Sequence, residues 1–431
     1  MSHFIEGLVE PIGIIGMGLS GTAAFKLIKM LTPKKSVVTF DSKPGAAEWH
    51  DLDKMFSETK VKTLIVSPGV PLSTPAIKLA KDRGVRITSE LALATSCLTT
   101  EKVIAVTGSV GKSTTVSLLA AATQAFDSNN LAVGNIGKPL AEYVFEVLSG
   151  KRARATWLSL ELSSFQLENY ENLLADHSVL TFFTSNHLER YKDLAEYYET
   201  KWTLVSKTKG FIFVNRQSSD LFNFAKTKKN THVALCLPND QNLKDLKLFE
   251  SQLLGAHNQQ NICLVASLAQ KLGWPQTSMD AIKKFPGLPH RLENLGVFKG
   301  ICFVNDSKAT ALDSVISAVD SLSQKVSSPS SLYLLLGGKD KNLPWPALSH
   351  LIEISNLKIF YFGESAAKAK AGTGLDGPVF SMLGPALDQV FLKLKAGDTL
   401  LLSPGGTSHD EFKNFEDRGH FFIKKVLSQF S

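Results

Sequence analysis

The stretch VTGSVGKSTT, residues 106–115, decides how the middle of the chain folds. The apolar residues before Gly108 predict a strand, and those after Gly111 predict a helix. A strand, a glycine turn and a helix in this order form a phosphate cradle, because backbone amides and the helix N-terminus face the anion. The usual nucleotide loop has four residues between its glycines. Here Ser109 and Val110 alone separate them, so the loop is a short form.

The side chains that follow the turn fit a nucleotide. Lys112 adds positive charge for the β- and γ-phosphates, and Ser113 supplies a hydroxyl for Mg²⁺. A glycine turn that merely caps a helix is the alternative for a bare GxxGK pattern. The preceding strand and the Ser-Thr-Thr run favour phosphate binding, with ATP and Mg²⁺ as the expected cofactors.

Composition limits the class of protein. A length of 431 residues predicts two or three domains, and 44% hydrophobic with 20% charged residues is typical of a globular chain. The net charge of +7 favours an anionic partner. Since no Lys/Arg-rich block occurs, we expect nucleotides or phosphorylated small molecules and no nucleic acid.

The cysteines and the apolar runs indicate where the protein works. The four cysteines are scattered and form no CxxC pair, which predicts reduced thiols in a cytoplasmic protein and no zinc knuckle. No signal-peptide pattern and no apolar run of about 18 residues occurs, so we expect no membrane span.

Short strands alternate with helices along the whole chain, which predicts an α/β fold with parallel sheets. A segment rich in proline and glycine, residues 285–296, marks the last domain boundary. After it, four strands each end in a Gly-, Ser- or Asp-rich turn, where ligands of open α/β sheets bind. We expect three domains: Rossmann-like 1–98, P-loop-type 99–287 and Rossmann-like 288–431.

A second glycine motif lies near the N-terminus. Gly16, Gly18 and Gly21 have the spacing of a dinucleotide fingerprint, and Asp41 follows at the distance that this motif requires. Alone, the motif predicts NAD(P). Because an ATP loop follows downstream, the first turn is equally suited to another diphosphate, such as a UDP-sugar.

Three further residues carry possible metal chemistry. Glu161 lies at the end of an apolar strand, where a carboxylate is a good Mg²⁺ ligand or a solvated acid. His187 and Lys201, taken singly, are typical of structural and surface side chains.

Beyond these patterns, the chain resembles the Mur ligase family over its whole length, closest to the members that add D-glutamate. The short loop GSVGKSTT is similar to the family form, and further motifs follow in family order. They are GNIG (134–137), ELSSFQLE (161–168), NHLERY (186–191), AHNQQN (256–261), GLPHR (287–291), NDSKAT (305–310), GGKDK (337–341) and SPGGTSHDEFKNFEDRG (403–419).

The resemblance implies a reaction. ATP phosphorylates the carboxylate of UDP-N-acetylmuramoyl-L-alanine, the amine of D-glutamate attacks the acyl phosphate, and phosphate leaves. Phosphorylation makes sense because a carboxylate is a poor electrophile, and the crowded negative charge calls for Mg²⁺. The resemblance further implies a cytoplasmic enzyme of peptidoglycan synthesis, and we expect a monomer.

The resemblance also implies roles for single residues, carried over position by position. Lys201 falls where the family has a carbamylated lysine, which turns a cation into an anionic metal ligand. The catalytic and metal set is Lys112, Ser113, Glu161, His187 and Lys201. The ATP contacts are Gly108, Gly111, Lys112, Ser113, Thr114, Asn258, Asn261, Arg291 and Asp306. The UDP-substrate contacts are Leu19, Ser20, Asp41, Ser42, Lys43 and Asn135. The D-glutamate contacts are Lys308, Thr310, Lys341, Ser408 and Phe415.

Two positions depart from the family pattern. Val110 replaces the loop asparagine, and Asn186 replaces the aspartate before the histidine. We expect an active enzyme with altered metal or ATP affinity. The alternatives are another ligase of the superfamily, such as a folylpolyglutamate synthase or a Mur ligase for a different amino acid, a catalytically silent nucleotide-sugar-binding protein, and a nicotinamide oxidoreductase.

Overall fold

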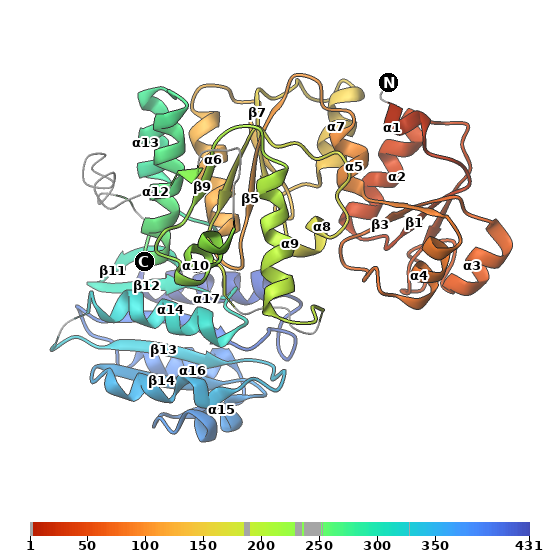
Figure 1. The fold of residues 1–431 in the computed structure, drawn as a ribbon. Coiled ribbons are helices and arrows are strands. Elements are labelled where there is room, and N and C mark those ends of the chain that lie inside the picture. Colours follow the sequence, from red (N-terminus) through yellow and green to blue (C-terminus); the bar gives the residue numbers. More distant parts are fainter. Residues whose placement is uncertain (1–2, 185–189, 229–234, 237–250, 252, 327) are drawn as a thin grey trace. The chain divides into compact units, whose positions relative to one another are not determined.

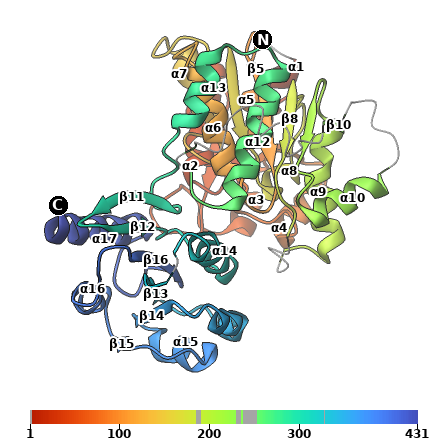
Figure 2. The same cartoon turned by 90° about the vertical axis from the view of Figure 1, so that its left-hand side faces the viewer.

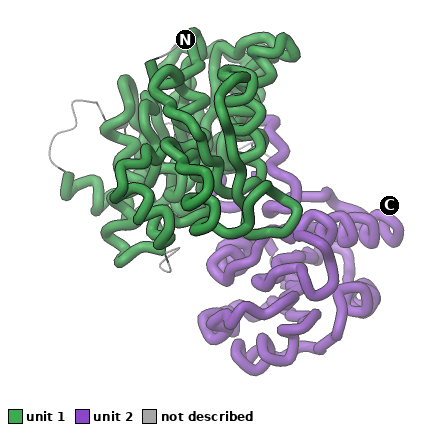
Figure 3. Tube along the Cα trace, turned by 90° about the vertical axis from the view of Figure 1, so that its right-hand side faces the viewer, with its two compact units in different colours: residues 1–249, 260–283 green, residues 250–259, 284–431 purple. Residues whose placement is uncertain are grey.

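The computed structural model describes residues 3–184, 190–228, 235–236, 251, 253–326 and 328–431. Two compact units share these residues (Figure 3). Unit 1 comprises residues 1–249 and 260–283, and unit 2 comprises residues 250–259 and 284–431. Helix α12 (Ala256–Lys271) therefore belongs to both units.

The N-terminal part of unit 1 is a four-stranded parallel sheet in the order β2-β1-β3-β4 (Figure 1). Its strands are β1 (Ile12–Ile15), β2 (Val37–Phe40), β3 (Thr63–Val66) and β4 (Arg86–Thr88). Its helices are α1 (His3–Glu6), α2 (Leu19–Leu31), α3 (Leu52–Thr59), α4 (Pro75–Asp82) and α5 (Glu90–Thr95). Neighbouring residues Ile14 and Ile15 lie in different core clusters, one with α2 and α5 and the other with α3 and α4, so helices cover both faces.

The rest of unit 1 is built on a six-stranded parallel sheet in the order β10-β9-β8-β5-β7-β6. The strands are β5 (Lys102–Thr107), β6 (Leu131–Gly134), β7 (Trp157–Glu161), β8 (His177–Leu180), β9 (Ile212–Val214) and β10 (Leu235–Cys236). The helices are α6 (Lys112–Gln124), α7 (Leu140–Leu148), α8 (Ser164–Leu167), α9 (Leu194–Ser206), α10 (Ser219–Thr227), α12 and α13 (Gln276–Lys284).

One hydrophobic core joins the two sheets of unit 1. Ile12 and Leu27 of the first sheet region share a buried cluster with Val133, Tyr143 and Leu160 of the second. At the surface of the same contact, the Lys26 ammonium lies 3.2 Å from the Glu142 carboxylate. Burial of apolar area stabilises this contact far more than the exposed ion pair does.

Unit 2 contains a six-stranded sheet in the order β11-β12-β16-β13-β14-β15, parallel except for the antiparallel pair β11 and β12. The strands are β11 (Glu293–Phe298), β12 (Ile301–Asn305), β13 (Leu332–Gly337), β14 (Leu357–Phe362), β15 (Val379–Phe380) and β16 (Thr399–Gly405). The helices are α14 (Leu312–Ser323), the 3₁₀ helix η2 (Trp345–Glu353), α15 (Ala366–Thr373), α16 (Leu383–Phe391) and α17 (Phe415–Phe430). Helices α14 and α15 cover one face, and α16 and α17 cover the other (Figure 2).

These sheets confirm the predicted α/β class. The predicted strand 12–15 is present with those bounds, and the strand before Gly108 ends at Thr107. Part of the predicted boundary segment is a strand, because residues 293–296 of it begin β11. The exact limits of the three expected domains stay a prediction.

Candidate active site

Parallel strand order brings the candidate residues of unit 1 to one sheet edge. Strand β5 lies between β7 and β8, and β6 lies next to β7. The carboxyl ends of these strands lead directly into Gly108, Glu161 and Asn135. Since parallel strands end at the same edge, three separate sequence motifs meet there.

The short loop has the backbone of a phosphate cradle. Gly108 and Gly111 have φ angles of 152° and 87°, and the latter is the N-cap of α6. A Cβ at Gly108 would lie 2.0 Å from the Thr181 hydroxyl, and one at Gly111 would lie 2.8 Å from Asn261 Oδ1. Glycine is therefore required at both positions, and Asn261, an expected ATP contact, lies beside the loop.

Two lysines meet at one carbonyl in this loop. Lys112 Nζ donates to Gly108 O at 2.8 Å and to Ser109 O at 3.0 Å. Lys201 Nζ, from helix α9, donates to the same Gly108 O at 2.9 Å. The second lysine, which looks like a surface residue in the sequence, thus contacts the loop directly.

Lys201 is almost completely buried, with 1% of its surface exposed. Burial, reinforced by the nearby Lys112 charge and opposed by Glu161, holds the pKa of Lys201 well below its ordinary range. Its ammonium lies 4.5 Å from the centroid of the Tyr197 ring, whose hydroxyl donates to Ser109 Oγ at 3.2 Å. An amine with a depressed pKa is partly neutral, and the neutral form is the nucleophile that reacts with carbon dioxide.

Glu161, at the end of β7, is a buried carboxylate with 1% of its surface exposed. Its Oε1 accepts a hydrogen bond from Asn135 Nδ2 at 2.8 Å. Its Oε2 is buried and has no hydrogen-bond partner among the described residues. An unsatisfied carboxylate oxygen in the interior is costly unless a cation or donor occupies the adjoining space. This oxygen fits a magnesium ligand.

A cleft of about 390 Å³ lies between the two sheet regions of unit 1. Its lining includes Leu19 and Ser20 from the first glycine turn, Asn135 after β6, Pro68 after β3 and Gln166 in α8. The expected substrate residues Leu19, Ser20 and Asn135 are therefore brought together. Asp41, Ser42 and Lys43 do not line this cleft.

Asp41 holds the backbone of its own turn. Its carboxylate accepts from Met17 N at 2.7 Å and from Lys43 N at 2.8 Å. The bond from Lys43, then that from Met17, lowers the pKa of Asp41. Both oxygens are engaged, so in this structure Asp41 shapes the first glycine turn.

Asp306, one of the expected ATP contacts in unit 2, lies at the carboxyl end of β12. Asp306 accepts from Leu292 N at 3.0 Å and from Ser403 Oγ at 2.8 Å. Burial raises the pKa of Asp306 to about 7, although both bonds and the Arg291 charge oppose the rise. Asn258, at the start of α12, donates to Leu254 O at 2.7 Å.

The expected D-glutamate residues lie at the same edge of the unit 2 sheet. Lys308 Nζ is 3.8 Å from the centroid of the Phe415 ring. Burial, together with Arg291, lowers the pKa of Lys308, and Glu416 opposes the shift. Lys341 and Ser408 follow β13 and β16, whose loops are joined by Lys339 N to Thr407 O at 2.8 Å. Thr310 follows in the loop after Lys308.

Arg418 was missed in the sequence analysis. It is fully buried and donates to Ser307 Oγ and to the carbonyls of Ser307, Gly406 and Thr407, at 2.8–3.1 Å. Burial lowers the pKa of Arg418 to about 10, against the attraction of Asp410 and Glu411. The arginine fixes the loops that carry Lys308 and Ser408. Its motif had been noted, but only the structure reveals its partners.

Two earlier assignments lie outside the described residues: His187 and Asn186.

Among the residues that the structure describes, no group of three or more His, Cys, Asp or Glu side chains could hold a metal ion. No described helix is long and apolar enough to cross a membrane.

Comparisons with known proteins identify the family of the chain. The family model for the Mur ligase middle domain matches residues 106–269. A UDP-N-acetylmuramoylalanine–D-glutamate ligase of Myxococcus xanthus is 31% identical, over 97% of this chain and 98% of the relative. The enzyme of the same name from Buchnera aphidicola subsp. Schizaphis graminum is also 31% identical, over 96% of this chain and 97% of the relative.

Solved structures share the fold at low sequence identity. The MurF ligase of Thermotoga maritima in complex with ADP has a TM-score of 0.61 at 14% identity, covering 91% of this chain and 95% of that chain. UDP-N-acetylmuramate-alanine ligase MurC of Thermotoga maritima has a TM-score of 0.58 at 14% identity, covering 97% of this chain and 99% of that chain.

Proposed function

This chain belongs to the family of UDP-N-acetylmuramoylalanine–D-glutamate ligases, and from this premise we propose how its residues carry out the reaction. It is an ATP-dependent ligase of peptidoglycan precursor synthesis that adds D-glutamate to UDP-N-acetylmuramoyl-L-alanine. The γ-phosphoryl group passes to the alanyl carboxylate and ADP leaves. The D-glutamate amine then attacks the carbonyl carbon, and the C–O bond to phosphate breaks.

ATP binds at the short glycine loop. The amides after Gly108 and at the start of α6 face its phosphates, with Ser113 and Thr114 in the first helical turn. Lys112 now donates to two loop carbonyls, and it turns toward the β- and γ-phosphates when they arrive. The backbone amides of the loop and the Lys112 ammonium then stabilise the negative charge that develops on the transferred phosphoryl group.

Magnesium fits the residues at this edge, because Glu161 Oε2 is buried without a hydrogen-bond partner in the described chain. Glu161, Ser113, a carbamylated Lys201 and His187 would hold it, the last lying outside the described residues. Bound there, the ion supplies positive charge that neutralises phosphate oxygens. A carbamate on Lys201 replaces a repelling ammonium with an oxygen ligand of the kind hard cations prefer.

The nucleotide sugar occupies the cleft of about 390 Å³ that Leu19, Ser20 and Asn135 line. Asp41 acts by holding the first glycine turn, and Ser42 and Lys43 lie beside it. In unit 2, we assign D-glutamate to Lys308, Thr310, Lys341, Ser408 and Phe415, since two carboxylates require cationic and hydroxyl donors. Arg291, Asp306, Asn258 and Asn261 are assigned to ATP.

The observation that carries this proposal is the Gly108 carbonyl, which accepts from the ATP-loop lysine and from a buried lysine. Purified protein is expected to release phosphate only when ATP, UDP-N-acetylmuramoyl-L-alanine and D-glutamate are all present. In parallel assays, L-glutamate, L-alanine or diaminopimelate replaces D-glutamate, and tetrahydrofolate replaces the UDP-substrate. Release with one of these instead of D-glutamate would contradict the assigned substrate.

Carbamylation has its own test. Lys201→Ala is expected to be nearly inactive, and a short-chain carboxylic acid is expected to restore part of its activity by supplying the missing anionic oxygen. Lys207→Ala, in the residue that ends the same helix, is the matched control. Normal rates for Lys201→Ala without added acid would contradict the carbamate.

A further inference from the structure

Arg190 lies in a cluster of hydrogen-bonded and stacked side chains near the cleft of unit 1. Its Nε and Nη2 donate to both Glu168 oxygens, with distances of 2.7–3.2 Å. Its Nη1 donates to Pro68 O at 3.0 Å, and its Cζ lies 4.0 Å from the centroid of the Phe165 ring. Tyr191 Oη adds a hydrogen bond of 2.6 Å to Glu168. All three donor nitrogens of the guanidinium are therefore engaged.

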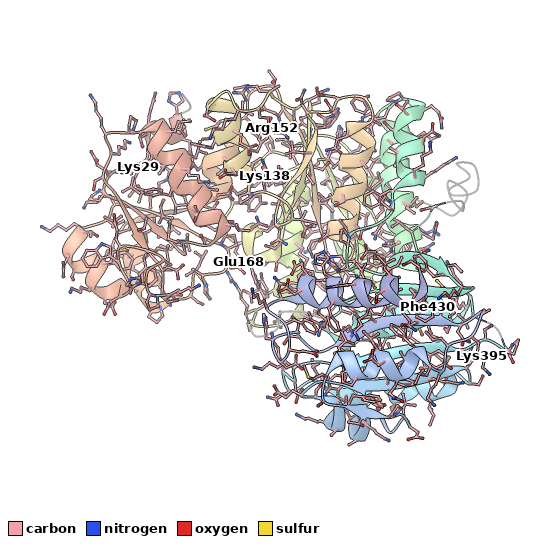
Figure 4. The ribbon with its side chains drawn as sticks, turned by 180° about the vertical axis from the view of Figure 1, so that it is seen from behind. Lys29, Lys138, Arg152, Glu168, Lys395 and Phe430 are labelled. Atoms are coloured by element: carbon pink, nitrogen blue, oxygen red, sulfur yellow. The ribbon has the colours of Figure 1, made fainter. Side chains whose placement is uncertain are left out.

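The pair is shielded from water. The side chains of Arg190 and Glu168 are 12% and 19% exposed. Glu168, labelled in Figure 4, directly follows the short helix α8. A forked pair with this geometry and shielding holds its partners more firmly than an ordinary surface ion pair.

Pro68 connects this cluster with the cleft. It lines the cleft together with Gly16, and Ser67 Oγ donates to Gly16 O at 2.6 Å. Pro68 also lines a second, very small void of about 10 Å³ together with Phe165 and Gln166. The residues around Pro68 are therefore closely packed. The loop after β3 is thus held by the first glycine turn on one side and by Arg190 on the other.

A second arginine in unit 1, away from the cleft, has partners of the same kinds, although the pair is more exposed to water. Arg86 Nη2 lies 3.2 Å from Glu171 Oε2, Arg86 Nη1 donates to Gly7 O at 3.1 Å, and its Cζ lies 4.6 Å from the centroid of the Phe4 ring. Thr88 Oγ1 also donates to Glu171. Each arginine joins a glutamate, a carbonyl of the N-terminal sheet region and a phenylalanine ring. Neither Gly7 nor Arg86 lines the cleft.

We propose that Arg190, held by Glu168, is a positioning residue for the UDP-substrate: it fixes Pro68, and so the width of the cleft, without touching the substrate. The inference rests on the proposed function, because it takes the nucleotide sugar to be the occupant of the cleft. Lysine cannot replace Arg190, since one ammonium cannot bridge both Glu168 oxygens, reach the Pro68 carbonyl and stack on Phe165 together.

The test compares Arg190→Lys with Arg86→Lys. Calorimetry without ATP gives the dissociation constant of UDP-N-acetylmuramoyl-L-alanine, and phosphate release gives kcat and each KM. For Arg190→Lys, we expect the dissociation constant and KM of the UDP-substrate to rise about tenfold, with kcat and the KM values of ATP and D-glutamate within about twofold. For Arg86→Lys, we expect all of these values to stay within about twofold.

Two more variants keep the proposal open to refutation if Arg190→Lys does not fold. Glu168→Gln weakens the fork and Phe165→Leu removes the stacking platform, and each is expected to weaken UDP-substrate binding about threefold to fivefold. Thermal melting of every variant identifies losses that follow from unfolding alone. Equal effects of Arg190→Lys and Arg86→Lys, or a parallel rise of all three KM values, would overturn the positioning role.

Failure of the proposed function gives a different result. Wild-type protein that does not bind UDP-N-acetylmuramoyl-L-alanine refutes the assigned occupant of the cleft. Wild-type protein that binds it, with Arg190→Lys binding equally well, refutes only the positioning role.

Discussion

Unit 1 contains two turns with the same order of strand, glycine turn and helix, yet only after the second does the helix begin with a charged residue. Residues 16–21, which span the turn after β1 and the start of α2, include no lysine or arginine. Between β5 and α6, Gly111 is followed by Lys112, whose ammonium lies 2.8 Å from Gly108 O. Both turns present backbone amides to an anion. The comparison shows that two turns with the same glycine-rich geometry differ in the side chain that follows them, and under the proposed function this lysine is what equips the second turn for phosphoryl transfer.

The glycines themselves also differ in what they contact. A Cβ at Gly21 would lie 2.0 Å from Gly16 O, and one at Gly108 would lie 2.0 Å from Thr181 Oγ1. A Cβ at Gly18 would have no atom within 4 Å. Close packing therefore requires glycine at Gly21 in the first turn and at Gly108 and Gly111 in the second, but not at Gly18.

Removing the charge from the second turn is expected to have the largest effect. Lys112→Ala should lower the rate of phosphate release by about 1,000-fold, because a positioned donor to the transferred phosphoryl group is lost. Binding of the UDP-substrate, measured by calorimetry, should stay within about twofold, since its cleft has other lining residues. Lys29→Ala, in the last turn of α2 and labelled in Figure 4, is the control. Near-normal turnover of Lys112→Ala would remove the contrast between the turns.

Crowding the first turn should affect the other substrate. Gly21→Ala forces α2 away from the Gly16 carbonyl, which cannot move aside as a side chain can. We expect a loss of about 1–3 kcal/mol in the free energy of unfolding and at least about tenfold weaker UDP-substrate binding. ATP binding by the purified variant, measured by fluorescence titration, should not change. If ATP binding weakens as much, the turns do not act separately.

The buried lysine beside the second turn should make stability depend on pH. Because the folded pKa of Lys201 is lowered, the unfolded chain binds more protons between that pKa and the ordinary lysine value. The free energy of unfolding in buffer without carbon dioxide should therefore rise with pH across this window, by at most about 1.4 kcal/mol per pH unit. Denaturant titrations of Lys201→Met should lack this contribution. An identical slope in both proteins would show that Lys201 is protonated in the folded state.

The smallest effect is expected at the glycine without neighbours. Gly18 has a φ of −70°, which any residue can adopt, and a Cβ at this position would have no atom within 4 Å. The variant Gly18→Ala should therefore fit without strain. Its free energy of unfolding should stay within about 0.5 kcal/mol of wild type, and its KM for the UDP-substrate within about threefold. Gly21→Ala is its matched partner in the same motif. A loss at Gly18 as large as that at Gly21 would indicate that the substrate itself needs the space.

The sequence predicted elements whose cause is local. Apolar runs and glycine turns predicted the strand 12–15 and the loop between β5 and α6, because period and turn chemistry act over a few residues. Strand β11 was not predicted, because the glycines and prolines around it are typical of a loop. It forms a strand because it pairs with β12.

The site was predicted less completely, for a different physical reason. Lys201 looked like a helical surface residue, and its burial depends on a contact with Gly108, far away in the sequence. Arg418 and the Arg190–Glu168 pair were not identified either, because their partners come from distant segments. Resemblance to a family pointed to Lys201 where periodicity did not. The roles of the individual site residues stay predictions until the variants are measured.

Helix α12 gives the chain an unusual path between its units. The chain leaves unit 1 after residue 249, enters unit 2 for residues 250–259, returns for 260–283 and leaves again. Leu254 packs on the core of unit 2 together with Leu292. A gene fragment that starts at residue 284 would therefore encode unit 2 with part of its core missing. A single protease cut within residues 284–292 would divide the chain, and residues 250–259 would stay on the N-terminal fragment although they belong to unit 2. Exchange of unit 2 between related genes by one crossover would therefore either leave native residues 250–259 in a foreign unit 2 or carry foreign residues 260–283 into unit 1.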